Sequence, residues 1–166
     1  MATILAQRVT VPNDKNIVVF LIGMRINKWW MFHRWLPVAL AMPRMLKELR
    51  QKPESGYLGG LLLPGISVQY WESTAKLMAY AQDRKGEHYP AWSRFQRKVG
   101  TDGTVGIWHE TFDVPAGSFE SVYVNMPRHG LGKIFEPIPA TGARASAERR
   151  LGKRADYPRD EPAANY

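Results

Sequence analysis

Two histidines and two tryptophans stand in two neighbouring segments, HYPAWSRF (88–95) and VGIWHETF (105–112), where they could surround a ligand. His88 and Trp92 are four residues apart, so they share one face of a helix. A histidine on a helix above a sheet can ligate haem iron while an acceptor holds its other ring nitrogen. The alternative is a histidine that caps the helix start or is partly exposed there. The spacing makes His88 a candidate metal ligand and Trp92 a candidate cofactor contact.

The second segment adds a candidate base. His109 lies in an expected strand, where alternation places it on one face and its neighbours Trp108 and Glu110 on the other. Imidazole is well suited to proton abstraction near neutral pH, so His109 could act as a general base. A hydrogen-bonded histidine that packs between sheet and helix is an equal alternative.

Four more residues complete the candidate site. Asn125 and Arg128, in VNMPRHG, follow the last expected strand and could hold an oxyanion or a carboxylate. Such residues also close strand ends by bonding backbone groups. Tyr70 and Trp108 provide flat apolar surface that could enclose a cofactor, and core filling is the alternative.

Several classes of enzyme lack their signatures in this sequence. No histidine occurs in HExxH, and there is no cysteine, Walker loop, GxSxG motif or GxGxxG after a strand. These absences disfavour zinc and thiolate chemistry, serine hydrolysis, NTP hydrolysis and dinucleotide binding.

Length and charge limit the classes further. The 166 residues fit one domain, and the longest apolar run, 35–43, is shorter than the roughly 18–20 residues of a membrane span. The start of the chain lacks the pattern of a secretory signal, which predicts a soluble, cytoplasmic protein. The net charge of +8 raises nucleic-acid binding. The basic residues are scattered without a recognition motif, however, so nucleic acid is disfavoured as a partner.

Hydrophobic patterning predicts the elements that position these residues. NIVVFLIGMRI (16–26) is typical of a buried strand, in which Gly23 marks a bulge or the close approach of a ligand. A helix is expected from Pro37 with a kink or restart at Pro43. The other expected elements are strands 56–64 and 66–71, helices 74–83 and 88–99, and a hairpin of strands 104–114 and 118–126.

This order, β-α-β-β-α-β-β, indicates an α+β fold of the ferredoxin-like split βαβ type with an added strand. Such a sheet has helices on one face only, so a second copy is expected to cover the other face in a homodimer. After Phe135 the composition changes to Pro, Ala, Arg and Asp. We therefore expect a domain over 1–135 and a basic tail over 136–166 that is disordered or wraps a partner.

Several motifs in order resemble one family over roughly residues 9–135: VVFLIGMRINKWW, GYLGG, YWES, AYAQD, HYPAW, VGIWHETF and YVNMPRHGLG. They are similar to monooxygenases that contain the DUF4188 domain, a family similar to the fungal fumagillin-pathway polyketide monooxygenase. The resemblance implies a dimeric α+β barrel and a monooxygenase or other oxidoreductase of secondary metabolism. Its substrate would be a small apolar or aromatic metabolite.

The resemblance allows two mechanisms. Without a cofactor, His109 would remove a proton from the substrate, and Asn125 or Arg128 would stabilise negative charge. With haem, His88 would be the proximal ligand and the three aromatic candidates would enclose the porphyrin. The alternatives are a lyase similar to the haem aldoxime dehydratases, or an accessory protein that binds haem or another small ligand without turnover.

Overall fold

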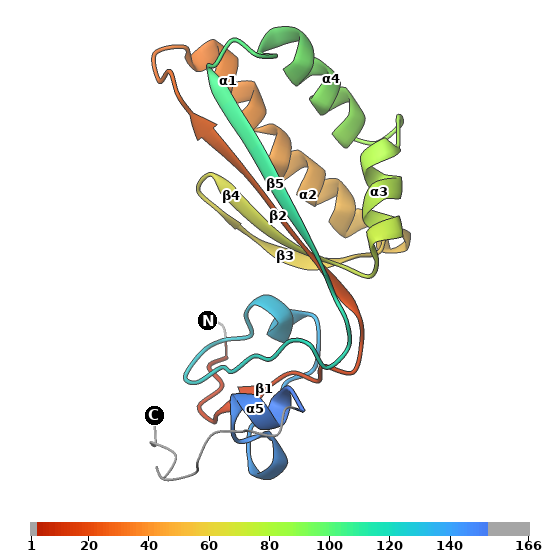
Figure 1. Ribbon diagram of the computed structural model, residues 1–166. Helices are drawn as coiled ribbons and strands as arrows, with labels where there is room; N and C mark the ends of the chain where they lie inside the picture. Colours follow the sequence, from red (N-terminus) through yellow and green to blue (C-terminus); the bar gives the residue numbers. More distant parts are fainter. Residues whose placement is uncertain (1–2, 153–166) are drawn as a thin grey trace.

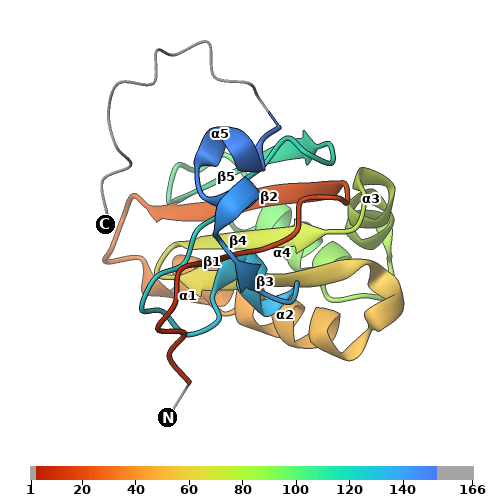
Figure 2. The ribbon, with the colours of Figure 1, turned by 90° about the horizontal axis from the view of Figure 1, so that it is seen from below.

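A four-stranded antiparallel sheet forms the centre of the computed structural model, which describes residues 3–152 (Figure 1). The strands stand in the order β3-β4-β2-β5 (Figure 2). Their bounds are β2 (Ile17–Ile26), β3 (Tyr57–Leu63), β4 (Ile66–Trp71) and β5 (Val105–Val114). β4 thus lies between β2 and β3, and β2 lies between β4 and β5. This interleaving of the two β-α-β units is the ferredoxin-like arrangement that the sequence predicts.

Four helices connect these strands and lie together on one face of the sheet (Figure 2). Helices α1 (Phe32–Ala39) and α2 (Ala41–Gln51) join β2 to β3, and a short turn of 3₁₀ helix, η1 (Pro53–Ser55), precedes β3. Helices α3 (Thr74–Gln82) and α4 (His88–Lys98) join β4 to β5. The α+β fold class is confirmed.

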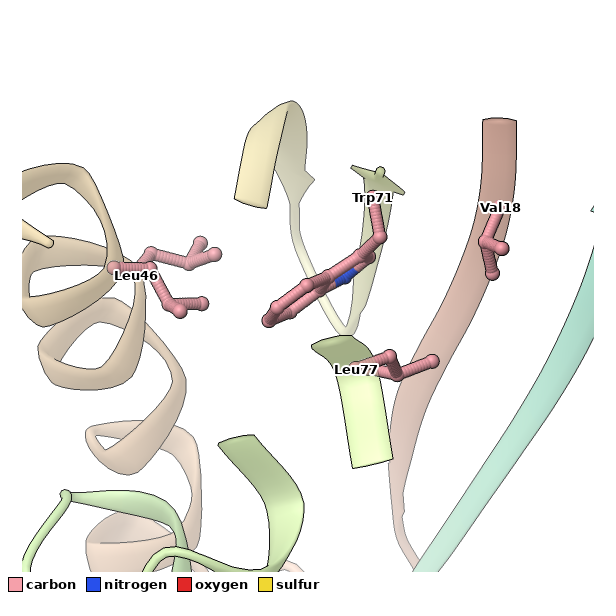
Figure 3. Packing of buried hydrophobic residues seen from close by; sticks show 5 residues of the cluster. Val18, Leu46, Trp71 and Leu77 are labelled. Carbon is pink, nitrogen blue, oxygen red and sulfur yellow. The ribbon is translucent and has the colours of Figure 1, made fainter. Parts of the chain in front are cut away.

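The core lies between the sheet and helices α2 and α3. Trp71 is fully buried, and its indole nitrogen donates a hydrogen bond to the side-chain oxygen of Gln69 at 3.1 Å. Figure 3 shows Trp71 between Leu46 of α2 and Val18 of β2, with Leu77 of α3 beside it. The hydrogen bond satisfies the one polar atom of this side chain, so the indole can fill the core without an unpaired donor.

The other face of the sheet is partly covered by the two ends of the chain. Ile17 of β2 packs there with Val11 and Leu131. Strand β1 (Val9–Thr10) pairs with β6 (Ile138–Pro139) in a second, two-stranded sheet, and Figure 2 shows these segments in front of the main sheet. The remaining elements of this region are η2 (Gly130–Lys133), η3 (Gly142–Arg144) and α5 (Ala147–Arg150).

The predicted hairpin of 104–114 with 118–126 is wrong in its second strand. The turn after β5 is held by the N-terminal loop, because Gly117 N–H donates to the Asn13 carbonyl at 2.6 Å and Ala116 N–H to Asn16 Oδ1 at 2.9 Å. The chain is therefore directed away from β5, and residues 118–126 form only isolated bridges, with Leu5 and Val9 as partners.

Part of the predicted tail is folded. Within 136–152, β6 pairs with β1, and the Arg150 guanidinium lies 2.7 Å from a Glu120 carboxylate oxygen with its side chain only 5% exposed. Arg150 also donates to the carbonyls of Arg144 and Ala145. The composition misled the prediction because short helices and a two-residue strand need little apolar periodicity. Residues 153–166 lie outside the described part of the chain.

Two local expectations also differ from the structure. The helix that was expected to break at Pro43 breaks instead at Leu40, between α1 and α2. Pro43 is the third residue of α2, where a missing N–H costs no helical hydrogen bond. Gly23 is approached closely, but by the indole of Trp108: a Cβ added at Gly23 would lie 2.5 Å from its Nε1.

The buried indole gives a stability prediction. Trp71→Ala removes the largest fully buried side chain, so it should lower the free energy of unfolding by about 3–5 kcal/mol. Trp30→Ala, at a position 74% exposed, should change it by less than about 0.5 kcal/mol. Chemical denaturation followed by circular dichroism measures both variants. Equal losses in the two would show that Trp71 does not anchor the core.

Candidate functional site

A cleft of about 1060 Å³ opens between the sheet and the four helices. Its volume is slightly above the roughly 300–1,000 Å³ that is typical of small-molecule sites. Its walls are mostly apolar, and the side chains that form them include Phe20, Ile22, Met24, Val38, Met42, Met45, Trp92 and Phe95. These walls indicate a ligand with a large apolar surface.

His88 is held in one orientation at the edge of this cleft. It is the first residue of α4, and its Nδ1 lies 2.9 Å from the carbonyl oxygen of Ala81 in α3. A carbonyl can only accept a hydrogen bond, so Nδ1 carries the proton of the neutral ring. The lone pair is then on Nε2. This tautomer is the one in which Nε2 can coordinate a metal or accept a proton.

A partly buried carboxylate at the α3–α4 corner supports the chain next to His88. Glu48 of α2 accepts hydrogen bonds from Lys52 at 2.7 Å, from the Tyr80 hydroxyl at 3.1 Å and from the Glu87 N–H at 2.9 Å. Burial alone would raise the pKa of Glu48, but these hydrogen bonds lower it below its ordinary value. Burial and the neighbouring Glu48 charge raise the pKa of Tyr80. Glu48 therefore ties α2 to α3 and to the residue before His88.

His109 lines the same cleft from the sheet side. It stands on β5 opposite Ile22 of β2, and its ring centroid is 5.5 Å from that of Phe20. The ring is exposed, so an imidazole nitrogen can reach a bound molecule. The structure thus brings His88, Trp92 and His109 to one cleft.

The other two aromatic candidates lie on the opposite face of the sheet. Tyr70 packs with Tyr123 in the cluster around Ile17, and burial raises the pKa of its phenol. Trp108 covers Gly23 on that face and is 40% exposed. Neither residue, therefore, lines the cleft of this chain.

Asn125 and Arg128 lie in the segment that packs against the N-terminal strand, and neither lines the cleft. Asn125 has a positive φ of 51°, a left-handed conformation that asparagine tolerates. Arg128 forms an ion pair with Glu136, and this contact raises the pKa of Arg128 and lowers that of Glu136. The guanidinium proposed for an oxyanion thus already has a carboxylate partner.

Patterns in the sequence do not reveal the basic side chains of the cleft. Arg84 lines it, as do Arg34 of α1 and Arg94 and Lys98 of α4, and the described residues place no aspartate or glutamate in its walls. In the sequence these residues belong to scattered basic runs such as RFQRK. Only the packing of α1 against α4 brings Arg34, Arg94 and Lys98 together. No group of three or more metal-ligating side chains occurs within residues 3–152.

The fold and the cleft define an α+β protein with a ferredoxin-like sheet and a large, mostly apolar cleft. The sequence profile of the family described as "Monooxygenase af470-like" matches residues 17–131, and the chain belongs to this family. The match covers the sheet, all four helices and the whole cleft. It supports the monooxygenase-like assignment that the sequence motifs predict. No curated protein matches the chain.

Two solved structures of aldoxime dehydratase resemble the fold, one of them in complex with butyraldoxime. Both have a TM-score of 0.60, with sequence identities of 18% and 19%. The matches cover 78% and 84% of this chain but only 39% and 45% of the dehydratases, so the chain spans less than half of their length. At this identity the likeness establishes the fold. No helix within residues 3–152 is long and apolar enough to cross a membrane.

The Glu48 hydrogen bonds predict a pH effect. A carboxylate whose pKa is lowered by folding stabilises the protein above its ordinary pKa of 4.5, and this contribution is lost as the pH falls through the lowered value. Glu48→Gln should therefore lower the free energy of unfolding at neutral pH by roughly 1–3 kcal/mol, with a smaller deficit in acid. Urea denaturation of the wild type and the variant at a series of pH values measures this difference in the free energy of unfolding. The exposed Glu72→Gln is the control, and a deficit independent of pH would contradict the assigned role.

Proposed function

We propose that this protein is a monooxygenase whose cleft binds a small apolar or aromatic metabolite. The family match supports the type of reaction, and the apolar walls support the class of substrate. Apolar walls exclude water from a bound molecule. This exclusion prevents side reactions of reactive intermediates with water and strengthens electrostatic interactions at the site.

The observation that carries a haem-dependent form of this proposal is the hydrogen bond from His88 Nδ1 to the Ala81 carbonyl at 2.9 Å. Histidines that bind metals usually donate their second ring N–H to such an acceptor, which leaves Nε2 as the ligand atom. The residues present therefore fit haem: His88 would hold the iron, and Trp92 and Phe95 would contact the porphyrin. Bound haem would supply the activation of dioxygen.

The rest of the cleft has a definite task in either form of the reaction. Phe20 and the methionines of α2 orient an apolar substrate against the sheet, and His109 offers an imidazole beside it. In a cofactor-free reaction, His109 would accept the substrate proton that must leave before dioxygen reacts with the carbanion or phenolate. The packing of His109 beside the Phe20 ring, at the wall of the cleft, supports this cofactor-free reaction as a second candidate function.

Absorption spectroscopy of the protein produced with haem precursor tests the role of His88. The wild type should show a Soret band that is lost or shifted in His88→Ala, because the axial nitrogen is removed. His129→Ala removes an exposed histidine outside the cleft and should leave the spectrum unchanged. A wild type with no Soret band after addition of haemin would exclude the haem-dependent form and leave cofactor-free oxygenation at His109.

Turnover assays separate the remaining activities. Oxygen consumption with an electron-rich phenol would support oxygenation, whereas conversion of an aldoxime to a nitrile would support a lyase. Ligand binding with neither reaction would indicate an accessory protein.

The open face of the sheet supports a homodimer. Trp108 and Phe112 of β5 are 40% and 47% exposed on the face opposite the helices. An apolar sheet face of this kind is normally covered, and a second copy would cover it symmetrically. In such a dimer, Trp108 would belong to the interface.

Sedimentation equilibrium tests this arrangement. Trp108→Glu should convert the dimer to a monomer, because the interface would bury an unpaired carboxylate. Trp30→Glu, at an exposed position in the loop before α1, should leave the dimer intact. A wild-type monomer, or a dimer that survives Trp108→Glu, would contradict a sheet-to-sheet interface.

A further inference from the structure

Three basic side chains border the cleft where α1 meets α4. Arg94 and Lys98 are one turn apart on α4 and thus share a face of that helix. Arg34 reaches them from α1, where its guanidinium donates a hydrogen bond to the backbone carbonyl of Lys98. All three side chains line the cleft, and no carboxylate of residues 3–152 does so. The part of this mostly apolar cleft where α1 meets α4 therefore carries three positive charges, while a fourth basic residue, Arg84, lines it elsewhere.

One of these three charges is compensated within the chain. The Arg34 guanidinium lies 3.6 Å from the Asp102 carboxylate, whose pKa is lowered by hydrogen bonds from Thr104 and by the charge of Arg34. Arg94 and Lys98 have no carboxylate within 4.0 Å in the described part of the chain, where only four ion pairs occur. Their charges therefore face the cleft without an internal partner.

The helix dipole explains only part of this arrangement. Basic side chains in the last turn interact favourably with the C-terminal end of a helix, which accounts for Arg97 and Lys98. Arg94 is one turn earlier, beyond the range of that interaction. Arg97 belongs to the same last turn but does not line the cleft. Orientation toward the cleft is thus a separate feature of Arg94 and Lys98.

We propose that the ligand of this cleft carries an anionic group, a carboxylate, which Arg94 and Lys98 bind while the apolar walls hold the rest of the molecule. This inference rests on the proposed function and defines its substrate more closely. Charge-assisted hydrogen bonds from guanidinium or ammonium to carboxylate are stronger than neutral ones. The carboxylate belongs either to an organic acid substrate or to a propionate of haem.

A pair of fluorescent probes tests the charge requirement. Anilinonaphthalene sulfonate and phenyl naphthylamine share one apolar body, and only the first carries an anionic group. Fluorescence titration of the full chain should give a dissociation constant about tenfold or more lower for the sulfonate, as one or two charge-assisted hydrogen bonds imply. Added salt should narrow the difference.

Matched variants locate the effect. Arg94→Gln and the double variant with Lys98→Gln should bring the two probes to similar affinity, while Arg97→Gln on the same helix should keep the difference. Circular dichroism checks that each variant is folded. A sulfonate preference that survives the double variant would overturn the assignment of Arg94 and Lys98.

The outcomes separate this inference from the proposed function. If neither probe binds the wild type, the ligand site in the cleft fails, and the proposed function fails with it. If both bind with equal affinity, the cleft remains a ligand site and only the anion inference fails. Displacement of the sulfonate by decanoate would support an organic acid as the source of the carboxylate, and displacement by haemin alone would support the propionates.

Discussion

Burial of both faces of β2 is the constraint on which this structure depends. Its side chains alternate, so Val18 and Phe20 point to the helices while Ile17 and Val19 point to the opposite face. One face requires α2 and α3, which close over Trp71. The other requires the two ends of the chain. Each face of β2 is therefore covered by a different part of the sequence: one by α2 and α3, the other by the two ends of the chain.

The cleft forms where the end of β2 is no longer covered by core side chains on its helix side. Near its start β2 is covered on the helix side by Trp71 and Leu49, both fully buried. Toward its end, Ile22 and Met24 meet no such side chain and line the cleft instead. Across the cleft, Arg34 connects α1 to the C-terminal end of α4, and Glu48 connects α2 to the N-terminal end of α4. The helices are thus fixed at their ends, while the space between them remains available to a ligand.

Strand periodicity predicted more of the site than residue type did. It placed His109 on the face opposite Trp108 and Glu110, as the register with β2 shows. The aromatic character of Tyr70 wrongly suggests a place in the cleft, because Tyr70 alternates with Trp71 and so lies on the opposite face. Short-range patterns carry this information because they act within one strand.

Such local patterns do not predict contacts between segments that are far apart in the sequence. The turn after β5 is set by Asn13 and Asn16, about a hundred residues away, and nothing in 118–126 itself opposes a strand. Arg34 and Lys98 likewise become neighbours only when α1 packs against α4. Charges are especially hard to assign from sequence, because their meaning depends on the partners that folding provides.

The contrast between Arg128 and Arg94 shows how the partners decide the role of a basic residue. Each could hold an anion by its chemistry alone. Arg128 is paired with Glu136 at an exposed position, where an incoming anion would compete with that carboxylate and with water. Arg94 lines a mostly apolar cleft whose described walls contain no carboxylate, so an anion that binds there does not compete with one. A ligand that is apolar over most of its surface and anionic at one end satisfies both parts of the cleft, and binding of either part alone would leave the other unsatisfied.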